Sequence, residues 1–161
     1  MATNYIISLN QIIRLMKDFS LASVFIKDFG FGNTYDIGTS RQMLFPYMWA
    51  VPQPSTITNL NKTTIPVYNF SIIFADRIND EVNTFDRNGE SSNNGQEILS
   101  DMFQVAQDFV TYVNANWGQY GITILETINI TPTMDDTDDA VNGWVLDIQI
   151  KTKFINCEIA I

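Results

Sequence analysis

The chain has 161 residues, of which 45% are apolar and 12% aromatic. This composition excludes general disorder, which requires low hydrophobicity and a high density of charge, and the length is sufficient for one folded domain spanning residues 1–161. The 18 acidic residues outnumber the 9 basic ones and give a net charge of -9, which argues against nucleic-acid binding as the main task because phosphate neutralisation needs clustered Lys and Arg.

An amphipathic helix is predicted over residues 5–19. Apolar residues recur there at the spacing of one helix face, and the opposite face is polar. The apolar positions are Ile6, Leu9, Ile12, Ile13, Met16 and Phe19. Thr3 or Asn4 can cap the start of this helix, and its pattern favours packing on a sheet.

Two strands are expected next, over residues 23–31 and 45–51. The first carries aromatic residues in period-2 register and ends at a turn rich in glycine. In the second, Pro46 belongs at the start of the strand or on an edge, and Pro52 and Pro54 are expected to end it. Residues 55–63 then read as a polar connection or as the outer part of a hairpin.

The segment 64–75 predicts the most buried strand, because its β-branched and aromatic residues are nearly continuous. It is followed by a polar passage from 76 to 96 that is rich in Asn, Ser, Gly and acidic residues. Connections of this length inside a compact domain are usually functional or disordered. We therefore interpret 76–96 as an extended arm, and a second amphipathic helix is predicted after it, over 96–114.

The C-terminal part predicts two further strands. The first contains Ile122, Ile124, Ile128 and Ile130 and is expected to end at Pro132. The second, over 144–154, alternates apolar and polar residues as a strand with one core face and one solvated face does. Residues 133–143 between them are expected to form an acidic hairpin tip.

The predicted order is therefore α-β-β-β-α-β-β. An antiparallel sheet with two helices packed on one face, and with long interaction loops, places the chain in the α+β class.

The residue types offer little support for catalysis. The chain has no His, which removes the commonest general base and metal ligand, and its single Cys157 has no second Cys to pair with. No phosphate-binding glycine loop is present. We expect no enzyme activity, no catalytic residues and no cofactor.

One acidic run is a candidate for cation binding. Carboxylates crowd into a single short stretch, at Asp135, Asp136, Asp138 and Asp139. The stretch lacks the glycine and the distal glutamate of a calcium-binding EF-hand loop, so no metal site is predicted there. A looser cation site, a solvated tip, and a charged contact with a neighbouring subunit stay open.

The arm supplies the other candidate interface residues. At its root, Asp76 and Arg77 form either a strand-end ion pair or turn, or a contact with a neighbouring chain, since loops rooted in a rigid sheet commonly build interfaces. Further along the arm the candidates are Asn79, Asp80, Glu81, Asn83, Phe85 and Arg87.

The N-terminus lacks the pattern of a signal peptide, and no apolar run approaches the length of a membrane span. We expect no membrane partner and a protein made in the cytoplasm.

Several motifs, taken in order, resemble a known group of proteins. These are Phe29-Gly-Phe-Gly-Asn33, Phe45-Pro-Tyr-Met-Trp-Ala-Val-Pro-Gln-Pro54, Ile73-Phe-Ala-Asp-Arg77, Glu97-Ile-Leu-Ser-Asp101, Asn142-Gly-Trp-Val-Leu-Asp147 and the Cys157 tail. The set resembles small bacteriophage connector proteins related to tail-terminator and tail-completion proteins, in particular the neck ring proteins of crAss-like phages.

This resemblance implies a structural protein of the virion, assembled in the cytoplasm of the host bacterium and lying in the neck or tail region. Copies of the subunit would form a ring of 12 or 6, in contact with the portal and with other neck or tail proteins. Genome DNA would pass through the central channel without sequence-specific binding. The stretch from Asn83 to Gly95 looks longer than the corresponding connection in that group.

An alternative from a different class is a binding module. In that interpretation, the acidic loop at 135–139 captures a cation or a basic partner outside any viral assembly.

Overall fold

The computed structural model describes residues 8–37, 42–60, 63–78, 94–135 and 141–152. Within them, six strands form one sheet, accompanied by two α-helices and two short 3-10 helices. In chain order the elements are α1 (Leu9–Ala22), β1 (Asp28–Phe31), η1 (Thr34–Asp36), β2 (Tyr47–Leu60), β3 (Thr63–Arg77), α2 (Gly95–Asn116), η2 (Gly118–Tyr120), β4 (Ile122–Ile124), β5 (Asn129–Asp135) and β6 (Val141–Thr152).

The sheet is mixed and open. Its strand order is β1-β2-β3-β6-β4, and β5 also pairs with β6. β1 pairs with β2 in parallel, whereas every other pair is antiparallel. The α+β class is confirmed, and the prediction of a purely antiparallel sheet is wrong at β1. The connection from 32 to 46 is long enough for the crossover that a parallel pair requires.

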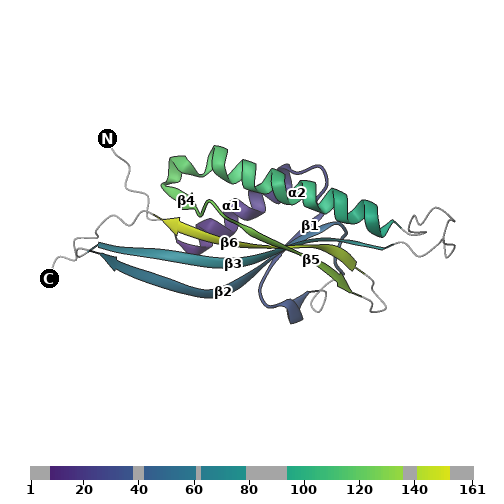
Figure 1. The fold of residues 1–161 in the computed structure, drawn as a ribbon, viewed down its shortest axis with the longest axis horizontal. Helices are drawn as coiled ribbons and strands as arrows, with labels where there is room; N and C mark the ends of the chain where they lie inside the picture. Colours follow the sequence, from purple (N-terminus) through teal and green to yellow (C-terminus); the bar gives the residue numbers. More distant parts are fainter. Residues whose placement is uncertain (1–7, 38–41, 61–62, 79–93, 136–140, 153–161) are drawn as a thin grey trace.

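Both helices cover the same face of this sheet, as predicted. One apolar core joins Met16 and Phe19 of α1 to α2 and to the alternate residues Phe70, Ile72 and Phe74 of β3. The ring centroids of Phe19 and Phe74 lie 5.1 and 5.8 Å from that of Phe109 in α2. Phe109 therefore connects the two helices to the middle of the sheet. Figure 1 shows both helices on one side of the sheet.

The start of α1 differs from the prediction. Ser8 caps the helix, and a capping box joins Ser8 and Gln11 through their side chains and backbone N–H groups. The caps proposed at Thr3 and Asn4 lie outside the described residues. The helix also continues to Ala22, because Phe19 and Ser20 are buried and the turn that ends it begins only at Ser23.

The prolines of β2 do not end the strand. β2 continues through Pro52 and Pro54 to Leu60 and pairs with β3 out to Thr63, so 55–60 is the outer part of a hairpin, which was one of the two interpretations of this segment. β1 covers the outer edge of β2 only from Tyr47 to Ala50, and no described strand pairs with that edge further along. A proline on such an edge loses no ladder hydrogen bond, and the register shifts between Gln53 and Thr56 instead.

A second apolar cluster lies on the sheet face opposite the helices. Its buried members are Met43, Tyr47, Trp49, Val51, Ile73 and Ala75. The residues just before β2 cover part of this face, and the Leu44 N–H donates to the carboxylate of Asp28 at 3.1 Å. The prediction of two helices on one face of the sheet did not include an apolar cluster on the other face.

The C-terminal strands are also divided differently. The strand predicted over 122–130 is two strands, β4 and β5, which lie one after the other along β6. β5 is an edge strand and therefore continues past Pro132 to Asp135. β6 shows the predicted alternation, with Leu146, Ile148 and Ile150 buried on the helix side.

Gly143 in β6 gives a direct test of this packing. A Cβ at this position would lie 2.0 Å from the backbone oxygen of Phe74 and 2.7 Å from the Cα of Ala75. Because backbone atoms cannot move aside, we expect Gly143→Ala to lower the free energy of unfolding by about 1–3 kcal/mol. Urea denaturation measures this change.

Gly118→Ala is the matched control, because nothing lies within 4 Å of a Cβ built there. We expect it to change the free energy of unfolding by less than about 0.5 kcal/mol. Equal stability of the two variants would contradict the close approach of β6 to β3.

Candidate functional site

The ends of β3 and β5 meet at one end of the sheet, on either side of the start of β6. Arg77 of β3 and Asp135 of β5 are both register partners of Val141. One residue inward, Asp76 and Met134 are both partners of Asn142. The two polar segments singled out in the sequence therefore begin at the ends of the two strands that flank β6.

The first turns of α2 lie against this same end (Figure 1). The side-chain amide of Asn142, which is 8% exposed, donates to the Gly95 carbonyl at 3.5 Å. Deeper in the sheet, the indole N–H of Trp144 donates to the Leu99 carbonyl at 2.7 Å, and its ring meets Phe103 edge-on. We refer to residues 76–78, 94–97, 134–135 and 141–142 together as the arm end.

The arm end is acidic. Burial raises the pKa of the half-buried Asp76 carboxyl above its ordinary value of 3.8, and the negative charge of Asp101 adds to this rise. The backbone N–H of Arg77, which donates to Asp76 at 2.8 Å, opposes it. Glu97 and Asp101 are exposed on the first turns of α2, so this end offers negative charge to a partner.

The structure describes three of the twelve predicted interface residues. Asp76 and Arg77 are the last two residues of β3 and pair with β6, so they do not form a turn, and the arm is shorter than the predicted 76–96. Gly95 and Gln96 likewise belong to α2. Asp135 ends β5. The other nine lie outside the described residues: Asn79, Asp80, Glu81, Asn83, Phe85, Arg87, Asp136, Asp138 and Asp139.

Among the residues that the structure describes, no group of three or more carboxylate or cysteine side chains lies together closely enough to hold a metal ion. The acidic run at 135–139, where a looser cation site was considered, falls outside those residues except for the backbone of Asp135. The cation-binding alternative therefore stays a hypothesis.

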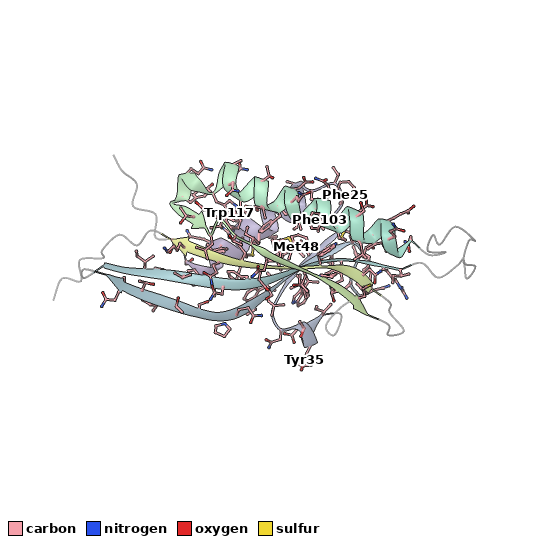
Figure 2. The ribbon with its side chains drawn as sticks, in the orientation of Figure 1. Phe25, Tyr35, Met48, Phe103 and Trp117 are labelled. Carbon is pink, nitrogen blue, oxygen red and sulfur yellow. The ribbon has the colours of Figure 1, made fainter. Side chains whose placement is uncertain are left out.

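A groove between α2 and β5 was not predicted from the sequence. It encloses about 340 Å³, and half-buried apolar side chains line it: Phe103, Val110, Ile128 and Ile130. Figure 2 shows Phe103 on the sheet side of α2. Phe103 lies beside the apolar stripe that the sequence predicts for α2 and makes this stripe wider than packing on the sheet alone requires. This extra width is the feature of the sequence from which the groove could have been predicted.

A second unpredicted surface lies where α1 leads into β1. Leu21 and Val24 are 73% and 80% exposed, and Phe25 is 46% exposed. The sequence interpretation placed 23–31 in one strand, but β1 begins only at Asp28. Exposed apolar groups of this size, close together in the chain, are typical of contact surfaces.

The chain matches no protein-family model, and a search of curated proteins also finds no match. Within the described ranges, no helix is both long and apolar enough to cross a membrane.

The raised pKa of Asp76 leads to a pH-dependent prediction. The folded protein holds the Asp76 proton more tightly than the unfolded chain does. Protonation of Asp76 therefore contributes stability that is fully present below pH 3.8 and is lost as the pH rises through the raised pKa of the folded state. Asp76→Asn cannot ionise and should lose less stability across this window. The difference should stay below about 1 kcal/mol, because Asp76 is only partly buried and solvent screens it.

Urea denaturation of both proteins between about pH 3 and pH 7 checks this, since that range spans the ordinary carboxyl pKa values. Asp101→Asn is the control, because removing its charge should reduce the pH dependence without abolishing it. An Asp76→Asn variant that loses stability relative to the original protein as the pH rises would contradict the assigned shift.

Proposed function

We propose that this protein is a structural subunit of a bacteriophage virion, which assembles with copies of itself into a ring in the neck between portal and tail. The ring of 12 or 6 subunits surrounds the channel through which the genome passes. The observation that carries this proposal is the arm end, where two polar segments begin at the ends of the two strands that flank β6.

The distribution of contact surfaces supports a ring. The arm end, the groove beside β5 and the exposed apolar residues after α1 are different surfaces of one molecule. A two-fold dimer joins the same patch on both partners, whereas a ring joins two different patches head to tail. A subunit with several unlike contact surfaces suits the second arrangement.

The charge of the chain is consistent with a DNA channel. With a net charge of -9, a ring of such subunits offers phosphates little attraction, so the genome slides past without sequence-specific binding. The ordered motifs that resemble phage connector proteins point to the same role, and portal, neck and tail proteins are the expected neighbours above and below the ring.

A second candidate function is a binding module that captures a basic partner outside a virion. The specific observation in its favour is that Asp76 and Glu97 both belong to the arm end and that Asp101 lies close enough to raise the pKa of Asp76. This function needs no large oligomer, so the assembly state separates the two candidates.

The ring proposal predicts large closed oligomers. We expect light scattering coupled to size-exclusion chromatography to give a mass near 12 or 6 subunits of 18.3 kDa, either alone or with the portal or tail partner. Negative-stain electron microscopy should show rings of one size. A protein that stays monomeric, also with its portal and tail partners, would contradict the proposal.

The arm is expected to serve assembly rather than folding. Asn142, the register partner of Asp76, bonds to Gly95, so the two ends of the arm lie close together and a short linker can join them. We expect replacement of residues 81–91 by a short Gly-Ser linker to leave thermal unfolding cooperative, since loop length changes stability only slowly. The same change should impair ring assembly.

Gly95 must be kept in this variant, because it is buried at the first position of α2. Circular dichroism follows the melting, and light scattering follows the assembly. Loss of cooperative melting would show that the arm belongs to the core of the subunit.

A further inference from the structure

The two-layer fold is open along its β5 side. β5 is the outermost strand on this side of β6, and α2 extends over β5. Leu146 of β6 lines the bottom of the space between α2 and β5, and no described residue closes its outer side. Phe103 and Val110 of α2 and Ile128 and Ile130 of the strand side stay half-buried there. Most residues that line this groove are apolar, and the exposed residues Gln107, Thr111 and Glu126 complete the lining.

β5 continues the apolar lining toward the arm end. Alternate residues of a strand point to the same side, which places Pro132 and Met134 in one row with Ile128 and Ile130. Met134 is 66% exposed. The row therefore has four apolar positions at period two, and it becomes more open toward Asp135.

The chain beyond β6 contains a matching row. Residues 153–161 read Lys-Phe-Ile-Asn-Cys-Glu-Ile-Ala-Ile, and every second residue from Ile155 onward is apolar. The four positions are Ile155, Cys157, Ile159 and Ile161. In an extended conformation they would form an apolar edge of the same length and spacing as the row on β5.

The apolar row that begins at Ile155 cannot lie along the groove of its own subunit. β6 ends at Thr152, opposite Ile122 of β4, whereas β5 begins opposite Asp147. To reach the outer side of β5, the chain after Thr152 must run back by five residues along β6 and across two strand spacings. This distance is about 20 Å, which takes about six extended residues. Ile155 and Cys157 follow Thr152 too closely to reach the groove of their own subunit, whereas a neighbouring copy can present the whole row from Ile155 to Ile161.

We propose that residues 153–161 of a second copy occupy the groove between α2 and β5. They lie along β5, and the apolar row from Ile155 to Ile161 contacts the row from Ile128 to Met134. Pro132 has no N–H to donate, so burial of apolar side chains rather than a complete hydrogen-bond ladder carries the contact. The inference rests on the proposed ring, because a segment passed from each copy to the next joins two different surfaces head to tail.

The single native cysteine provides the test. Cys157 belongs to the apolar row of the segment, so a second cysteine on the β5 row should come within disulfide distance of it. We would introduce Ile130→Cys and Met134→Cys separately in the full chain, oxidise mildly with copper phenanthroline, and separate the products under non-reducing conditions. We expect at least one variant to form disulfides between chains, identified by mass spectrometry of the linked peptides.

Thr131→Cys is the matched control, because Thr131 is exposed and alternation places it on the other side of β5. It should cross-link much less than the better of the two row variants. Equal cross-linking of the control would overturn the assigned face. A disulfide within one chain would also overturn the proposal, because it would show the segment folded back on its own subunit.

Light scattering of the same samples separates this inference from the ring itself. Rings that form without cross-linking of either row variant would overturn the groove contact and leave the ring proposal standing. Monomers without cross-links, also in the presence of the portal and tail partners, would overturn both.

A second pair of variants tests the contact without new cysteines. Ile155→Ser combined with Ile159→Ser removes two members of the apolar row, whereas Asn156→Ser combined with Glu158→Ser changes the alternate positions. We expect the first pair to raise the dissociation constant between copies by at least about tenfold, because each buried Ile contributes that much or more. Equal weakening by both pairs would overturn the assigned orientation.

Discussion

The burial of β3 between β2 and β6 is the constraint on which the rest of the structure depends. β3 is paired along nearly its whole length on both sides, and its alternate residues serve two cores. Phe70, Ile72 and Phe74 face the helices, whereas Ile73 and Ala75 face the smaller cluster on the other side. A strand that is buried on both faces has one allowed register, because a shift by one residue would exchange every contact.

That single register determines what lies at the arm end. Once Arg77 is placed opposite Val141, the start of β6 is set, and with it the positions of β5 and of the first turns of α2. The hydrogen bonds from Asn142 and Trp144 to helix carbonyls then hold α2 in place. The polar segments that begin after β3 and β5 are attached to this single arrangement of strands and helix. Every copy of the subunit can therefore present the same surface, which an assembly of identical subunits requires.

The same topology leaves surfaces incomplete. The sheet stops at β5 on one side while α2 continues over it, and apolar residues such as Phe103 and Ile130 stay half-covered. The exposed apolar residues after α1 form another uncovered surface. If neighbouring copies cover these two apolar surfaces and contact the arm end, one arrangement explains all three features. The proposed ring and the proposed groove contact support one another for this reason.

Local patterns were sufficient for the elements and for the class of fold. The apolar stripe around Met16, the continuous run before Asp76 and the alternation around Ile148 each predict an element that the structure contains, because side-chain periodicity reflects the face that is buried. The same patterns placed two helices on one face of a sheet in the α+β class. They also identified 76–77 and 135 as interface candidates, but as two unrelated places in the chain.

Tertiary structure alone decided how these elements are joined. A proline ends a strand only where a partner strand needs the N–H group that proline lacks. Pro52, Pro54 and Pro132 lie on edges of β2 and β5 that pair with no strand among the described residues, so the strands continue through them. The direction of β1 depends on the course of the connection from 32 to 46, which no local pattern contains. The sequence by itself determined which residues must be buried. The strand order alone decided that Arg77 and Asp135 lie on either side of Val141 and that a groove opens beside β5, because both depend on contacts between residues far apart in the chain.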